Sequence, residues 1–284
     1  MNDKLMLYLR IAAAVLFLAA GVWSTIYLVG LPFNATTTAM CALLAALWLL
    51  LAWLLLRGHP GRLIDSTPGF ILAGFFFGMV LIAPTVATNS SAVTLKNWLG
   101  LSNLQFGMLS PITEELLKFT TVFVLCTMVF RIRRPIEAVV VGIAVGFGFS
   151  AGEDATYVLK GALENLNSDV LGSLTGYGIR TIAGPWSHSI YTGLAAWGLG
   201  QFLCRTDKTI GWRTAQLIGW YVVGYATHAI FNSAAELPGE VAPIIGFFAT
   251  LLLSWVGGPW LYLRSRKIGR RDLADARPTA AHSA

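Results

Sequence analysis

The sequence predicts an all-α membrane protein in which about eight transmembrane helices form a single domain over residues 1–264. Three observations carry this prediction. Apolar residues make up 56% of the 284-residue chain, and only 12% of the residues are charged, about half the share usual in soluble domains. The mean hydropathy is +0.66. Several apolar runs approach 20 residues, which is long enough to cross a hydrocarbon core of about 30 Å.

Polar or proline-containing breaks separate eight apolar runs. The first run is longer than the apolar core of a signal peptide, so we expect an uncleaved span. The second run ends at Arg57 and the fourth at Arg131, and Pro135 is well placed to begin the fifth. A turn at Pro238 separates the last two runs. The expected spans are 9–30, 39–56, 69–87, 107–130, 136–158, 177–203, 213–235 and 241–263.

Basic residues are distributed unequally between the two sides of these spans. Sixteen of the 20 Lys and Arg residues lie near the N-terminus, in alternate connections or in the C-terminal tail, whereas the opposite connections hold only Lys96, Lys160 and Arg180. Cytoplasmic connections are enriched in Lys and Arg, so we expect both termini in the cytoplasm and the protein in the plasma or inner membrane. The net charge of +6 then reflects this bias and no nucleic-acid partner. The basic tail, residues 265–284, is expected to be disordered.

Four consecutive spans carry ionisable residues, which cost at least about 2.5 kcal/mol each at the centre of a span. The fourth span holds Glu114, Glu115 and Lys118. Glu114 and Lys118 are four positions apart, so they share a helix face and can pair. One carboxylate can thus pair with Lys118 while the other stays free for chemistry. A lone Glu–Lys pair is typical of a structural contact between helices. One lysine, however, cannot neutralise two adjacent carboxylates.

The next three spans add a carboxylate and two histidines. Glu153 lies on a glycine-rich helix that permits close approach of its neighbours, and Asp154 is expected to cap the end of this helix near water. The sixth span holds His188, and the seventh holds His228 with Asn232 on the same face. A single intramembrane histidine is often a packing group, but two beside carboxylates indicate a site.

These residues also share a depth in the membrane. Glu115, Glu153, His188 and His228 lie 15 to 18 residues from the cytoplasmic borders of their spans. At 1.5 Å per residue this is roughly 22–27 Å, in the outer half of the membrane. Unrelated structural residues need not agree in depth, whereas the residues of one site must.

Carboxylates and imidazoles support two schemes of peptide hydrolysis. They can hold Zn²⁺ with an open position for water. Alternatively, a Glu can activate water without a metal, while His and Asn stabilise the oxyanion. The rival interpretation is a proton-coupled transporter or channel with a Glu/His relay. Against it, the sequence shows no repeated halves, and its polar residues lie in one plane and not along a path.

At these residues the chain resembles the PrsW family of intramembrane proteases and, more distantly, the CAAX prenyl endopeptidase (Abi) superfamily. Each motif is short, but the motifs occur in order on successive spans over residues 107–235. The similar motifs are Glu114-Glu115-x-x-Lys118 for E-E-x-x-K, Phe149-x-x-x-Glu153 where CAAX-type members carry F-x-x-x-H, His188 for the PrsW-type histidine, and His228-x-x-x-Asn232 for H-x-x-x-N.

The resemblance implies a catalytic core at 107–235 and a protease that cuts a single-span membrane protein, such as an anti-sigma factor, near the outer face of the lipid bilayer. Zinc is the implied cofactor, with a metal-free enzyme as the alternative. Glu114 or Glu115 would be the general base, and Asn232 would orient or stabilise an oxyanion. The implied catalytic residues are Glu114, Glu115, Lys118 and Asn232, and the implied metal ligands are Glu153, His188 and His228.

Overall fold

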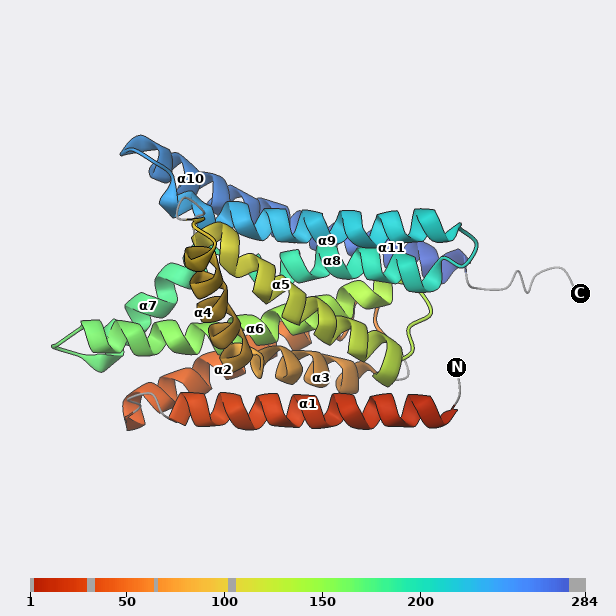
Figure 1. The fold of residues 1–284 in the computed structure, drawn as a ribbon, viewed down its shortest axis with the longest axis horizontal. Helices are drawn as coiled ribbons and strands as arrows, with labels where there is room; N and C mark the ends of the chain where they lie inside the picture. The colour runs from red at the N-terminus through yellow and green to blue at the C-terminus, as the bar shows by residue number, and fades with distance from the viewer. Residues whose placement is uncertain (1–2, 30–33, 64–65, 102–105, 276–284) are drawn as a thin grey trace, which may run out of the picture.

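The computed structural model describes residues 3–29, 34–63, 66–101 and 106–275, and no strand occurs among them. The α-helices form one elongated bundle (Figure 1). Short continuations follow some of them: η2 (Leu125–Val129), η3 (Ala234–Glu236) and η4 (Leu253–Gly257). The α-helices are α1 (Asp3–Val29), α2 (Ala35–Leu56), α3 (Thr67–Met79), α4 (Ile82–Trp98), α5 (Phe106–Val124), α6 (Pro135–Glu164), α7 (Asp169–Ala183), α8 (Ser187–Cys204), α9 (Ile210–Ser233), α10 (Val241–Leu252) and α11 (Gly258–Asp275).

Four helices of the described chain are long and apolar enough to cross a membrane, namely Leu7–Tyr27, Ala35–Leu56, Pro135–Glu164 and Val241–Asp275. A fifth crossing results if α3 and α4, which are bent by 40° relative to each other, count as one span. These segments correspond to five of the eight expected spans. The all-α class is confirmed, and the protein is an integral membrane protein.

The expected span 69–87 is broken between α3 and α4. Pro84 lacks the N–H that would bond the carbonyl of Val80 in a continuous helix. The hydroxyl of Ser24 in α1 donates to that carbonyl at 2.6 Å, and the backbone N–H of Ala83 donates to Ser24 Oγ at 3.3 Å. Helix α1 therefore satisfies backbone groups that the break frees.

The prediction of one helix over residues 177–203 is wrong, because α7 and α8 are separate helices. Pro185 disfavours helical backbone at the residue before it, and that residue, Gly184, has φ −154° and ψ 60°. His188 consequently lies in the first turn of α8 and not in the middle of a continuous span.

Helix α6 lies at the centre of the bundle and packs against α2, α3, α7 and α8 (Figure 1). Its glycines permit these contacts, as the sequence predicts. A Cβ on Gly146 would lie 2.6 Å from the carbonyl oxygen of His188 in α8, and a Cβ on Gly148 would overlap the carbonyl oxygen of Phe75 in α3. The helix that carries Glu153 is thus held closely on two sides.

The C-terminal part of the described chain is helical. Helix α11 continues through residue 275, so the prediction of a disordered tail is wrong for residues 265–275; residues 276–284 lie outside the described residues. The Nε2 atom of His59, in the turn after α2, lies 3.0 Å from Oγ of Ser265. This tertiary contact stabilises α11 as a helix. The polarity of the segment alone did not predict a helix.

Helix α1 begins and α11 ends at the same end of the bundle (Figure 1). The turn before α6 reaches this end too, because Arg134 donates to the carbonyl oxygens of Pro60 at 3.4 Å and Arg62 at 3.3 Å. Gly269 of α11 packs against the backbone of Gly61. We call this the basic end, since most of the Lys and Arg residues assigned to one side of the membrane lie in these segments.

Candidate active site

The predicted site residues come from four helices that meet inside the bundle. All but Glu153 and Asn232 are buried, and charged groups at this level of burial need partners. Their partners therefore define the site. The buried residues are Glu114, Glu115 and Lys118 on α5, His188 on α8 and His228 on α9, each at most 4% exposed.

The start of α5 is held tightly against the end of α9. A Cβ on Gly107 would lie 2.8 Å from the backbone of Asn232 and Ser233. The backbone N–H of Gly107 also donates to the carboxylate oxygens of Glu236, at 3.0 and 3.1 Å. This close approach brings the two carboxylates of α5 within reach of the histidine of α9.

Two partners share the Oε1 atom of Glu115. Nζ of Lys118 lies 2.5 Å from it, and Nδ1 of His228 lies 2.8 Å from it. Lys118 therefore pairs with Glu115, and not with Glu114, which the spacing of four had also allowed. Residues three apart share a helix face as well as residues four apart do, and Lys118 also donates to Nδ1 of His188 at 2.9 Å. The contact with α8 decides which carboxylate the lysine meets.

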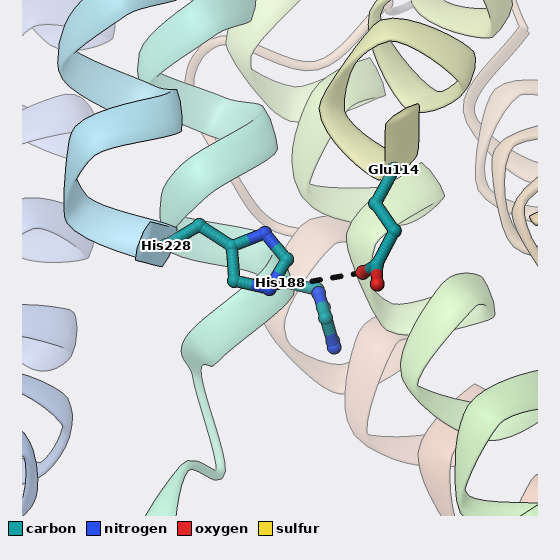
Figure 2. A group of neighbouring side chains, drawn as sticks. All are labelled: Glu114, His188 and His228. Atoms are coloured by element: carbon teal, nitrogen blue, oxygen red, sulfur yellow. Dashed lines mark ion pairs between the residues drawn. The ribbon is translucent and has the colours of Figure 1, made fainter. Parts of the chain in front are cut away.

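Glu114, His188 and His228 each bring one ligand-type atom to within 4.8 Å of the others (Figure 2). Oε2 of Glu114 lies 3.7 Å from Nε2 of His228 and has no hydrogen-bond partner among the described residues. The other oxygen of Glu114 accepts an N–H of Asn89 at 3.2 Å. Because a carboxylate only accepts, Nδ1 of His228 carries the proton toward Glu115, and the lone pair of Nε2 is left free.

Glu153 is not part of this group of three, contrary to the expectation that it joins the two histidines as a ligand. Its Oε2 atom forms an ion pair with Arg180 of α7 and accepts from Nε2 of His188 at 2.8 Å. The side chains of Glu153 and Arg180 are each 19% exposed. The Arg180 guanidinium pairs with the Glu153 carboxylate. The carboxylate in the group of three is instead that of Glu114 on α5.

A comparison with models of protein families identifies the family of this chain. Residues 66–256, about two thirds of the chain, match the model of the PrsW family intramembrane metalloprotease. The chain belongs to the PrsW family. It is therefore a membrane protease, and the transporter interpretation gains no support. No curated protein and no solved structure matches the chain.

A metalloprotease of the PrsW family needs a metal site, and the group of three fits a divalent cation. Its donors are imidazole nitrogen and carboxylate oxygen, which bind Zn²⁺ in catalytic sites. Oε2 of Glu114 is a buried acceptor without a hydrogen-bond partner among the described residues. A dication would also balance the excess of negative charge, because carboxylates outnumber cations around it. The charged residues are Glu114, Glu115, Glu153, Asp154, Lys118 and Arg180.

Asp154 is buried inside α6 and is not the expected cap near water. The helix continues to Glu164, because no proline interrupts it, and Asp154 is 4% exposed. Its Oδ2 accepts the indole N–H of Trp48 in α2 at 2.9 Å, and its Oδ1 lies 3.9 Å from Nε of Arg180. Sequence reasoning missed Arg180 as a site residue. A usable signal was that only three basic residues, Arg180 among them, lie in the connections expected on the outer side.

Two further sequence features lie beside the PrsW-family site. The amide of Asn232 donates to Oγ of Ser110 at 3.3 Å, and Ser110 precedes Glu114 by one helical turn. Residues 148–152 have the G-x-S-x-G pattern of serine hydrolases. They lie within α6 with Ser150 buried, whereas that motif requires a strand-to-helix turn. Ser150 is thus a packing residue of α6.

Proposed function

We propose that the protein hydrolyses a peptide bond of a single-span membrane protein with Zn²⁺ held by Glu114, His188 and His228. The observation that carries the proposal is the buried group of three ligand-type atoms within 4.8 Å of one another. When bound, the ion lowers the pKa of a water molecule and polarises the scissile carbonyl. To hold the ion, His188 would have to release one of its present contacts, with Lys118 or with Glu153.

Glu115 orients the ligand His228. The N–H at Nδ1 of His228 donates to Oε1 of Glu115 over 2.8 Å, and Nε2 faces Glu114. Metal-binding histidines commonly donate their other N–H to a carboxylate, which fixes the tautomer and the direction of the ring. Glu115 therefore acts on the metal site through His228.

We assign the proton transfer to Glu115. Its Oε1 is anchored by Lys118 and His228, whereas its Oε2 is buried without a hydrogen-bond partner among the described residues. A carboxylate with one anchored and one available oxygen can accept a proton from water while it keeps its position. Lys118 holds the anchored oxygen, and the amide of Asn232 stabilises the oxyanion.

We place this site in the outer half of the plasma or inner membrane, within eight spans and with both termini in the cytoplasm. The gathering of basic turns at the basic end supports this orientation. The proposed membrane domain is 1–264, with its catalytic core at 107–235. The expected depth of about 22–27 Å from the cytoplasmic border supports hydrolysis near the outer face, as for a substrate of the anti-sigma-factor type.

An open cavity beside the site offers a path for the substrate chain. Its volume is about 660 Å³, and it lies between α7 and the outer part of α6. Polar side chains such as Lys160, Asn167 and Thr175 line it, together with Arg180, which pairs with Glu153. We propose that the segment next to the span of the substrate passes through this cavity in an extended form.

The decisive experiment measures cleavage and bound metal in the same preparations. The protein is purified, reconstituted with a single-span reporter of the anti-sigma-factor type, and analysed for zinc. We expect Glu114→Gln and His228→Ala to lose zinc and at least about 100-fold in cleavage rate. Glu115→Gln should keep zinc and lose about 10²–10⁴-fold. Glu240→Gln is the matched control, because this side chain is exposed in the turn before α10 and lies outside the cavity.

Two results would contradict the proposal. Undiminished cleavage by Glu114→Gln would remove Glu114 from the site. Full cleavage by a preparation stripped of metal would refute the zinc scheme while leaving the protease activity itself in place.

A further inference from the structure

We infer that an anionic phospholipid binds in a groove between α8 and α11, in the leaflet at the basic end of the bundle. Its acyl chain lies in the groove, and its headgroup lies on the basic face of α11. This inference rests on residues outside the group of three and does not depend on the proposed function.

The groove is apolar and has the length of one leaflet. Its volume is about 500 Å³, and residues of α6, α8, α9 and α11 line it. Along α11 it extends from Gly258 to Ile268, about 15 Å at 1.5 Å per residue, which equals half of a hydrocarbon core about 30 Å thick. Its aromatic lining consists of Trp186, Trp197, Trp220, Trp260 and Tyr262.

Positive charge lies at the edge of the groove. Arg264 lines it, and the guanidinium carbon lies 5.5 Å from the centre of the Trp260 ring. Lys267 and Arg271 follow three and seven positions later on the same helix face, and all three basic side chains are exposed. Basic residues directly beside a membrane span attract anionic headgroups. The apolar groove and the basic face together match an amphipathic anionic lipid.

The size of the groove selects an acyl chain over a transmembrane helix. A helix with its side chains is about 10 Å across, so 500 Å³ would hold roughly one turn. A hydrocarbon chain is much thinner and can follow the whole groove. Trp186 lines one part of it and packs against Gly258. A bound chain therefore contacts the segment from which α8, and with it His188, begins.

Quenching of tryptophan fluorescence by brominated phospholipids tests this inference in the reconstituted full-length protein. We expect brominated phosphatidylglycerol to quench at a lower mole fraction than brominated phosphatidylcholine. Arg264→Gln combined with Lys267→Gln should reduce the preference about 25-fold, since each basic residue near the membrane surface contributes about fivefold. Arg57→Gln, exposed at the same end but outside the groove, is the matched control.

A second variant tests the groove itself. A Cβ on Gly193 meets its nearest atom, on Ile143, at 3.4 Å, so Gly193→Leu fills the groove and should weaken quenching by both lipids. Native mass spectrometry should find one phosphatidylglycerol per chain, and inorganic phosphate should not displace it. Equal quenching of the native protein by the two lipids, or an unchanged preference in the double variant, would overturn the inference. Unchanged quenching of Gly193→Leu would place the lipid elsewhere and would overturn it too.

Discussion

Nδ1 of His228 and Oε1 of Glu115 lie 2.8 Å apart, on two helices that approach each other closely at Gly107. The contact links a proposed metal ligand to the residue that we assign as the proton acceptor. Replacing Glu115 by Gln keeps an acceptor for His228, whereas Ala removes it. We expect zinc affinity to change little in the Gln variant and to fall about 10–100-fold in the Ala variant. Competition with a chelating dye measures both, and equal affinities would contradict the orienting role.

Lys118 connects α5 to α8 through Glu115 and His188. Lys118→Met leaves a buried carboxylate without its cation, and breaking a buried pair in this way costs about 3–5 kcal/mol. We expect a clearly lower thermal midpoint in detergent. Lys118→Met combined with Glu115→Gln should recover part of the loss, because the double variant removes the unpaired charge. A midpoint equal to that of the native protein in the single variant would show that the pair adds nothing to stability.

Arg180 pairs with Glu153 beside the proposed metal site. Removing this cation increases the local negative charge, so Arg180→Gln should bind zinc more tightly, by at least about threefold, while it cleaves more slowly. Arg180→Lys keeps the charge and should keep the native zinc affinity. Isothermal titration with zinc distinguishes the two variants. Weaker zinc binding by Arg180→Gln would indicate that the guanidinium positions a ligand and does not act through its charge.

Gly146 sets the distance between α6 and the start of α8. A Cβ at this position would lie 2.6 Å from the carbonyl oxygen of His188. Gly146→Ala should therefore displace His188, lower stability by about 1–3 kcal/mol and reduce cleavage. Gly219→Ala is the matched control, because no atom lies within 4 Å of its Cβ, and it should stabilise α9 by up to about 1 kcal/mol. Cleavage assays and thermal midpoints of both variants check this.

We expect the protein to become less stable as the pH is lowered, because of His59 in the turn between α2 and α3. Burial, with Arg266, Arg134 and Arg62 nearby, lowers the pKa of this imidazole from 6.5 to about 3. The unfolded chain therefore binds a proton at a higher pH than the folded protein does. Stability present above pH 6.5 is lost as the pH falls toward 3, by up to about 1.4 kcal/mol per unit. His59→Asn should flatten this slope between pH 6.5 and 4, and an equal slope in both proteins would assign it to other groups.

Sequence reasoning could place the site residues but not their partners. The structure brings Glu114, Glu115, His188 and His228 together. The common membrane depth expected for Glu115, Glu153, His188 and His228 stays a prediction from the constant rise per residue of a helix. The partner that each charged side chain pairs with depends on contacts with a neighbouring helix. Lys118 meets Glu115 because α8 offers His188 on that side, and no spacing within α5 encodes this.

Sequence reasoning also could not predict where an apolar run divides into two helices. Hydropathy treats residues 177–203 as one run, yet the break at Pro185 separates α7, so that Arg180 reaches Glu153. Pro84 breaks another run, and the side chain that compensates, Ser24, lies on α1. Proline positions were visible in the sequence. The distant groups that make these breaks tolerable were not.

The family match begins at residue 66, but the site does not depend on the matched residues alone. Trp48 of α2 lies before that point, and its indole N–H bonds the buried Asp154 beside Glu153. A recombinant fragment cut at residue 66 would leave that carboxylate without this donor and uncover the face of α6 on which α2 packs. We therefore expect the smallest working enzyme to include α2.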